Sequence, residues 1–371
     1  MRKYWITISI VYFFIFSIAG LTFLYQKRTT TEPDSVSQLP ASLLPTSTPR
    51  ATASPTPLPL PSSKILGGGT HTFQTFNNCG PSALSMALSY YDIFISQQIL
   101  GQDLRPYQNP QGNNDDKSVT LAELAKKGEE LGFIPYHRPA GSIDLIKKLT
   151  AQDIPVMTRT WLKPNEDIGH YRVVKGYDDV AGVVIQDDSL QGKDLRYSYS
   201  DFSTLWQAFN YEFLILVPVE KKEVVEALLG ELANEDVAWQ QALLNAESDI
   251  EQNPSNIYAV FNKSVALYYL QRYQESIDTF EQVESRLPSR MLWYQLEPIL
   301  AYYQVGNFPR VLQISEGILN NQNRAYSELH YLGGKIFESQ GESARAQETF
   351  RLADFYNTTE LWKSNLPEEI L

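Results

Sequence analysis

The chain has 371 residues, of which 43% are hydrophobic and 12% aromatic, enough apolar material for more than one folded core. Its formal net charge of -12 argues against a nucleic-acid-binding protein, because such a protein needs a basic surface to neutralise phosphates. A single cysteine excludes an intramolecular disulfide and any cysteine-rich metal site, and no metal-binding or nucleotide-binding motif is present, so neither metal nor cofactor is expected.

The first 28 residues are predicted to direct the chain to a membrane. Residues 4–25 form an uncharged, mostly apolar run, long enough as a helix to cross a hydrocarbon core about 30 Å thick. We interpret it as a single-pass transmembrane anchor, with a cleaved signal peptide as the alternative because the small residues Ser17 and Ala19 have the spacing of a cleavage site. Residues 29–63 are rich in Pro, Ser and Thr, which predicts an extended linker. The expected location of the folded part is outside the cytoplasm, membrane-bound or, after cleavage, secreted.

Residues 64–220 have the pattern of an α+β domain, with helices first and strands afterwards. Apolar residues at helical spacing predict helices that begin near Gly80, after a cap at Thr120, and near Ile143. Period-two alternation then predicts strands at residues 155–161, 170–177, 182–186 and 213–217. A turn sequence between the second and third of these strands predicts an antiparallel hairpin.

From residue 223 onward the strand patterns end and a repeat of 35 residues begins. Ala266, Ala301 and Ile336 recur at this period, and Gly306 and Gly341 occupy the expected turn between two helices of a pair. The pattern resembles the tetratricopeptide repeat, which implies an all-α solenoid over residues 223–360 that binds a protein partner. Residues 223–371 hold 22 acidic and 10 basic residues. We expect this region to fold separately.

Cys79 is the candidate nucleophile. It stands between Asn77-Asn78 and Gly80-Pro81, the residue types of a tight, exposed start of a helix. A helix N-terminus stabilises a negative charge, and a thiolate is the nucleophilic form of cysteine. Gln74 lies just upstream, where its amide could donate a hydrogen bond to a developing oxyanion.

His170 is the candidate base, because it opens a predicted strand and follows a glycine, which would let its ring project into a cleft. Asp187 ends the next strand of the hairpin, where its carboxylate could orient the imidazole. Asp188 is the competing candidate for that role. His71, expected in a strand, and His137 and His330 are interpreted as packing or surface residues.

Gln74, the run Asn78-Cys79-Gly80-Pro81, and Gly169-His170-Tyr171 together resemble the bacteriocin-processing (double-glycine) peptidase-like family. The resemblance covers about residues 64–219 and implies a papain-like fold. By match of motif it implies Cys79 as nucleophile, His170 as base, Asp187 as orienting acid and Gln74 as oxyanion donor. Family members often have Asp-Pro at the third segment, whereas Asp187 is followed by Asp188 here.

These observations predict a membrane-anchored, extracytoplasmic cysteine hydrolase that acts on peptide or related amide bonds, with a repeat domain for a protein partner. The alternative is a non-catalytic scaffold that keeps the peptidase fold and uses the repeats as its binding surface. Retention of a cysteine, a histidine, an acid and a glutamine together favours the enzyme, because a scaffold needs none of them.

Overall fold

The computed structural model describes residues 59–108, 118–320 and 323–371, which belong to one compact unit. In this part of the chain, no helix is both long enough and apolar enough to cross a membrane. The predicted anchor at residues 4–25 and most of the predicted linker lie outside the described residues.

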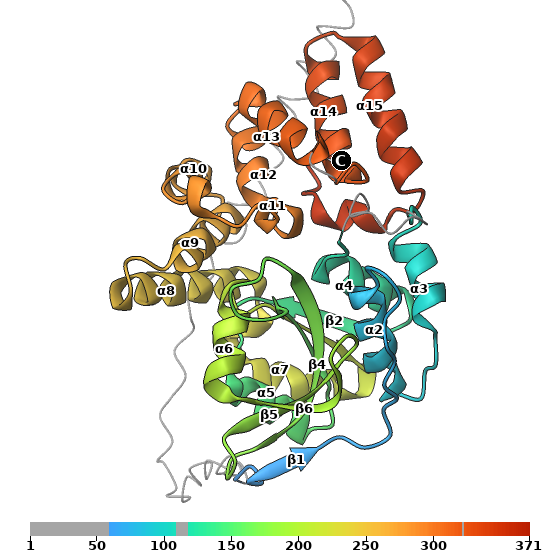
Figure 1. Ribbon diagram of the computed structural model, residues 1–371, viewed down its shortest axis with the longest axis vertical. Coiled ribbons are helices and arrows are strands. Elements are labelled where there is room, and N and C mark those ends of the chain that lie inside the picture. The colour runs from blue at the N-terminus through green and yellow to red at the C-terminus, as the bar shows by residue number, and fades with distance from the viewer. Residues whose placement is uncertain (1–58, 109–117, 321–322) are drawn as a thin grey trace, which may run out of the picture. The chain divides into compact units, whose positions relative to one another are not determined.

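The first part of this unit is built around an antiparallel sheet (Figure 1). Its strands have the order β2-β7-β3-β4-β5-β6, and β1 pairs with β4. The predicted strands are present as β3, β4, β5 and β7, and β4 and β5 form the predicted hairpin. The strand bounds are β1 Ser63–Ile65, β2 Ile134–Arg138, β3 Val156–Trp161, β4 Gly169–Asp178, β5 Val183–Asp188, β6 Gly192–Ser198 and β7 Phe213–Val217.

Helices cover both faces of the sheet, because its strands are apolar on both sides. In β7, Leu214 and Leu216 pack with helices α2 to α4, while the alternate residues Phe213, Ile215 and Val217 pack with α5 to α7. These helices are α2 Cys79–Ser89, α3 Gln97–Leu104, α4 Leu121–Glu130, α5 Ile143–Ala151, α6 Tyr199–Gln207 and α7 Lys222–Leu229.

The three predicted helices of this domain are α2, α4 and α5. The predicted cap of α4 is present: the Thr120 side chain accepts from the backbone N–H of Glu123, whose carboxylate accepts from the backbone N–H of Thr120. Gly132 follows that helix with φ of 90°, a conformation that favours glycine. Local sequence therefore sets the ends of α4.

The rest of the chain is helical, as the repeat predicts. Helices α9 and α10, α12 and α13, and α14 and α15 form pairs, and each pair turns at a residue with positive φ: Gln271, Gly306 and Gly341, spaced by 35 residues. The bounds are α8 Glu235–Gln252, α9 Ile257–Tyr269, α10 Tyr273–Glu281, α11 Met291–Tyr294, α12 Glu297–Gln304, α13 Phe308–Asn320, α14 Ser327–Ser339 and α15 Ser343–Tyr356.

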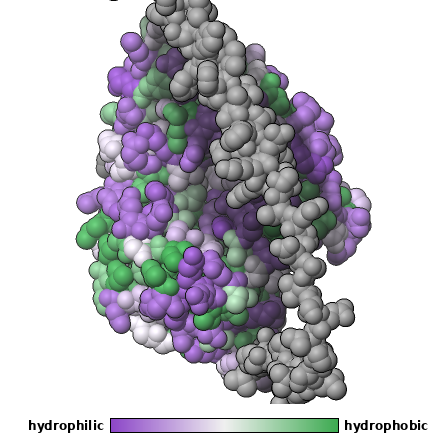
Figure 2. All heavy atoms as spheres, turned by 180° about the vertical axis from the view of Figure 1, so that it is seen from behind, coloured by the Kyte–Doolittle hydropathy of each residue, from purple (hydrophilic) through white to green (hydrophobic). Residues whose placement is uncertain are grey.

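The helical region shares a hydrophobic core with the sheet domain. Trp161 of β3 and Phe209 after α6 belong to the same buried cluster as Tyr294 and the helices α8 to α14. At the other end of the region, Leu361 packs into the core around α2 and α4. On the face seen in Figure 2, hydrophobic side chains are interspersed with hydrophilic ones. Apolar side chains from both regions are therefore buried together, which argues against separate folding of the helical region.

We expect Phe209→Ala to destabilise the sheet domain and the helical region together, by about 3–5 kcal/mol, because it removes a fully buried ring from their common core. Hydrogen exchange during denaturant titration measures this, since protection in both regions should be lost at the same lowered denaturant concentration. The control is Phe355→Ala, which truncates an exposed aromatic side chain of α15. Loss of protection in one region alone would contradict the shared core.

Candidate active site

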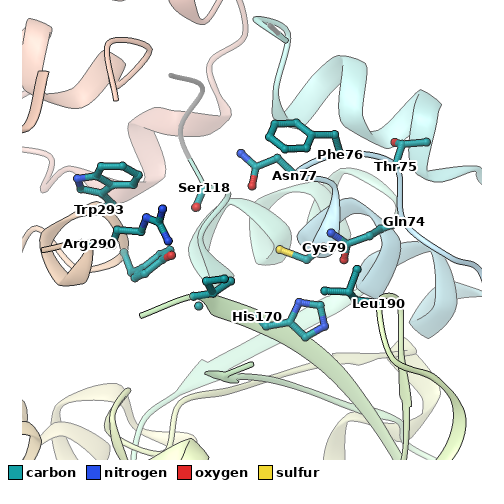
Figure 3. A pocket seen from close by; sticks show the side chains of 13 residues that line it. Gln74, Thr75, Phe76, Asn77, Cys79, Ser118, His170, Leu190, Arg290 and Trp293 are labelled. Atoms are coloured by element: carbon teal, nitrogen blue, oxygen red, sulfur yellow. The ribbon is translucent and has the colours of Figure 1, made fainter. Parts of the chain in front are cut away.

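Cys79 and His170 meet at the bottom of one cleft (Figure 3). Cys79 is the first residue of α2, where backbone N–H groups have no partner inside the helix, and His170 is the second residue of β4. The His170 ring is 2% exposed, and the nearby Cys79 side chain raises the pKa of the imidazole. The structure thus brings together the two residues that the sequence singled out as nucleophile and base.

The second partner of His170 is Asp188. The Nε2 atom of His170 lies 2.8 Å from Oδ1 of Asp188, which leaves Nδ1 for the thiol. The Asp188 carboxylate is fully buried, and it also accepts from the backbone N–H groups of Leu190 and Gln191, each at 2.8 Å. Nε of Arg172 lies 3.2 Å from its Oδ2. The acid is therefore fixed by several donors while it holds the imidazole.

This arrangement favours the charged forms of the pair. Burial opposes ionisation of both residues. For His170, hydrogen bonds to Asp188 and Cys79 outweigh burial, so its pKa lies above the ordinary value. For Asp188, burial is outweighed by the hydrogen bond from His170 and the charges of His170 and Arg172, so its pKa lies below the ordinary value.

Asp187, the sequence-based choice for the orienting acid, faces away from His170. Its Oδ1 lies 2.6 Å from Nζ of Lys175 and accepts from the backbone N–H of Asp194 at 3.0 Å. Its Oδ2 accepts from the Tyr90 hydroxyl at 3.3 Å. The expected contact between Asp187 and His170 is thus replaced by the contact with Asp188, and Asp187 links α2 to strands β4 and β6.

A one-residue irregularity in the hairpin decides which aspartate faces the histidine. Near the turn, Gly176 pairs with Ile185, but after a register shift Val173 pairs with Asp187 and Arg172 with Asp188. Because side chains alternate along a strand, the partner of Arg172 shares the face of His170. If the register did not shift, Asp187 would lie on the same face as His170.

Gln74 lines the same cleft, as the sequence predicted. Its backbone N–H donates to the carbonyl of Ser189 at 2.8 Å, and its Oε1 accepts from the Ser189 hydroxyl at 2.7 Å. Since Oε1 is engaged by Ser189, the Nε2 amide group is the end of the side chain that can donate toward the cleft. Ser189 therefore orients Gln74, a role that sequence reasoning missed.

Arg105 is a second residue that sequence reasoning missed. It is 3% exposed, and its Nη1 donates to Oδ1 of Asn78, the residue before Cys79. Its guanidinium also interacts electrostatically with Cys79. The buried, positively charged Arg105 side chain thus contacts the residue that precedes α2. Its position between α3 and the α2 N-terminus gave no sequence signal, because the contact spans 27 residues.

The far wall of the cleft comes from the helical region. Arg290, Trp293 and Tyr294, in or just before α11, line the cleft together with Cys79 and His170. A Cβ at Gly169 would lie 3.0 Å from the Tyr294 ring, so the glycine before His170 permits this close packing. The candidate catalytic residues predicted from the sequence all lie before residue 223.

The other histidines do not join the catalytic pair. His71 lies in an extended segment and not in the expected strand, and its Nε2 lies 2.9 Å from the backbone oxygen of Asp188. His137 contacts Glu212 at 3.0 Å, and His330 is buried, which lowers its pKa. Over residues 59–108, 118–320 and 323–371, no group of three or more His, Cys, Asp or Glu side chains is arranged to hold a metal ion.

We expect Asp188→Asn to lower the pKa of His170, because the substitution removes the anion that stabilises the imidazolium. The matched change Asp187→Asn should leave the His170 titration in place, since that carboxylate is bonded to Lys175 and Tyr90. NMR titration of the imidazole signals measures both. A shift caused by Asp187→Asn and not by Asp188→Asn would contradict this geometry.

Residues 69–213 match the model of the Peptidase_C39 like family. Among solved structures, the chain is similar to a C39-like peptidase from Bacillus anthracis, at 21% identity and a TM-score of 0.33, over 42% of this chain and 97% of that chain. It is also similar to the peptidase domain of Streptococcus ComA, a bi-functional ABC transporter involved in a quorum sensing pathway, at 21% identity and a TM-score of 0.32, over 41% of this chain and 98% of that chain. No curated protein matches the chain. The protein thus contains a sheet-plus-helix domain that is C39 peptidase-like, followed by a helical C-terminal region.

Proposed function

We propose that this protein is a cysteine peptidase that cleaves peptide or related amide bonds with Cys79, His170 and Asp188. The single observation that carries the proposal is that the half-buried Cys79 lies beside His170, whose buried ring contacts the buried Asp188 carboxylate at 2.8 Å. The match of residues 69–213 to a peptidase family supports the same reaction class. A scaffold gains nothing from burying a histidine and an aspartate together, because burial of charged groups costs free energy.

The positions of these residues support a mechanism of acyl transfer. Sγ of Cys79 attacks the carbonyl carbon of the substrate, and its proton passes to Nδ1 of His170. The backbone N–H of Cys79 and Nε2 of Gln74 donate to the oxyanion. As the carbon–nitrogen bond breaks, His170 returns the proton to the leaving amine. Water, deprotonated by His170, then attacks the thioester, which releases the carboxylic acid and regenerates the thiol.

Asp188 keeps His170 oriented through this cycle. Its carboxylate accepts from Nε2, which presents Nδ1 to the thiol and stabilises the imidazolium formed after proton transfer. Arg172 and two backbone N–H groups hold the carboxylate, so the acid is prepared before substrate binds.

We expect Cys79→Ala to abolish cleavage of a peptide substrate without loss of the fold, and Gln74→Ala to lower kcat by roughly 100-fold or more by removing an oxyanion donor. Ser189→Ala should reduce kcat less, because it loosens Gln74 without removing its amide. A peptide-based thiol-reactive probe with mass-spectrometric mapping identifies the reactive residue. Equal labelling of Cys79 in the folded and the urea-unfolded protein would refute an activated site.

We propose further that the peptidase is held at the outer face of a membrane by residues 4–25. The uncharged apolar run, followed by the Pro-, Ser- and Thr-rich residues 29–63, supports this placement. Deletion of residues 1–28 should release the protein from the membrane fraction into the soluble fraction. Added protease should degrade the anchored domains in intact cells. If those domains are degraded only after the cells are lysed, they lie on the cytoplasmic side of the membrane and the proposed placement is wrong.

The 35-residue spacing of the helix pairs supports a tetratricopeptide-type helical region that binds a protein. Because α11 lines the catalytic cleft, the protein bound there can be the substrate itself.

A further inference from the structure

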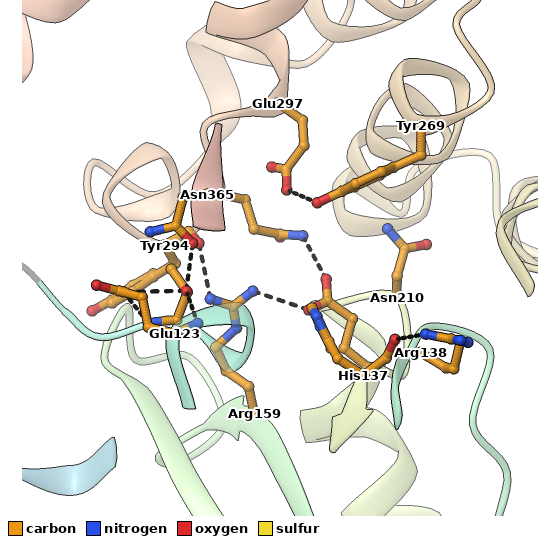
Figure 4. Close-up of polar contacts among 12 residues, drawn as sticks. Glu123, His137, Arg138, Arg159, Asn210, Tyr269, Tyr294, Glu297 and Asn365 are labelled. Atoms are coloured by element: carbon orange, nitrogen blue, oxygen red, sulfur yellow. Dashed lines mark hydrogen bonds and ion pairs between the residues drawn. The ribbon is translucent and has the colours of Figure 1, made fainter. Parts of the chain in front are cut away.

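The wall formed by α11 is fixed in place by buried polar contacts with the sheet domain (Figure 4). Nη1 of Arg159 in β3 donates to the backbone oxygen of Tyr294 at 2.9 Å, and its Nη2 lies 3.2 Å from Glu212. The same Glu212 accepts from the side-chain amide of Gln295 at 3.2 Å. Arg159 and Glu212 are 5% and 3% exposed, so these bonds are made away from water. Buried hydrogen bonds and ion pairs therefore fix the position of α11 beside the cleft.

The outer end of α11 is held as well. Nη1 of Arg290 lies 3.1 Å from Asp167, and the Tyr294 hydroxyl donates to the backbone oxygen of Asp167 at 3.2 Å. The Arg290 guanidinium stands over the Trp293 ring at 5.5 Å. Asp167 lies three residues before His170, so these contacts position Trp293 relative to the catalytic strand.

The cleft beside this wall offers apolar surface to a substrate. Its volume is about 350 Å³, and three large hydrophobic residues that line it are exposed: Phe76 by 53%, Ile168 by 40% and Leu190 by 50%. Trp293 is half-buried. It lies on one side of Cys79, and Gln74 and Leu190 lie on the other side (Figure 3). Burial of such surface by a bulky side chain is favourable, and aromatic residues commonly anchor bound peptides.

A second hollow continues from the same wall over the helical region. Arg290 and Trp293 line both hollows, and the second has a volume of about 750 Å³. Its other walls include Ser289 before α11 and the exposed side chains of Gln313 and Asn320 on α13. Hydroxyl and amide groups can bond to the main chain of an extended peptide, whatever its sequence.

We propose that Trp293 is a substrate-specificity residue, and that the substrate is an extended polypeptide with a bulky apolar side chain on Trp293, continuing into the hollow beside α13. This inference rests on the proposed peptidase function. In this proposal the helical region forms part of the substrate-binding site, because the substrate contacts α11 while its scissile bond lies at Cys79. A short peptide that ends at Trp293 lacks the contacts of the second hollow.

The test uses the full chain carrying Cys79→Ala, which binds without cleaving, and an array of synthetic 15-residue peptides of varied sequence. We expect the bound peptides to be enriched in aromatic and large aliphatic residues. Adding Trp293→Ala should weaken their binding about tenfold or more, and Trp293→Phe should restore part of it. Phe355→Ala, an exposed aromatic change on α15, should have no effect. Gln313→Ala should weaken binding of 15-residue peptides and not of five-residue fragments containing the apolar residue.

Parallel cleavage of the same peptides by the chain with Cys79 intact separates the two proposals. Cleavage and binding that are both indifferent to Trp293→Ala overturn the inference and leave the peptidase function in place. Binding that depends on Trp293, with no cleavage of any peptide, overturns the function and supports the contact. If no peptide is bound or cleaved, both proposals are wrong.

Discussion

The relative positions of His170 and Asp188 in the candidate site follow from the pairing of β4 with β5. One register shift between Val174 and Gly176 places Asp188 opposite Arg172, and so on the face of His170. The same shift turns Asp187 toward Lys175 and Tyr90, where it ties α2 to the sheet. A glycine is needed at position 176, next to the register shift, since a Cβ there would lie 2.3 Å from the backbone oxygen of Lys64 in β1. A local irregularity thus aligns Asp188, His170 and the helix that begins at Cys79.

Several residues of the site act by fixing others. Ser189 orients Gln74, Arg105 holds the residue before Cys79, and Arg172 holds Asp188. Such contacts preorganise the reacting groups, so that little reorganisation is needed when charge develops on the substrate. The ion pair between Arg172 and Asp188 also explains why these two buried charges persist, because each offsets the cost of burying the other.

The helical region is part of this preorganisation. Its core is continuous with that of the sheet domain, and Arg159 and Glu212 bind the backbone and side chains around α11. Close to the same interface, burial and the neighbouring charge of Glu212 raise the pKa of Glu297 to about 7. The Glu297 carboxylate accepts from the Tyr269 hydroxyl at 3.1 Å (Figure 4). Polar contacts as well as apolar packing therefore join the two regions.

The local features of the fold could be predicted from the amino-acid sequence alone. Period-two and helical patterns predicted β3, β4, β5, β7, α2, α4, α5 and the helix pairs of the repeat, because these signals lie within a few neighbouring positions. The residues around Cys79 and His170 likewise marked these two as the candidate catalytic pair. Strands β1 and β6 and the short helix α11 gave no clear pattern. The choice of Asp188 over Asp187 depended on a register shift, and the place of Trp293 in the cleft depended on contacts between residues more than 100 positions apart. Strand register and the packing of distant segments could not be predicted from local sequence, because they are set by the whole core and not by adjacent residues.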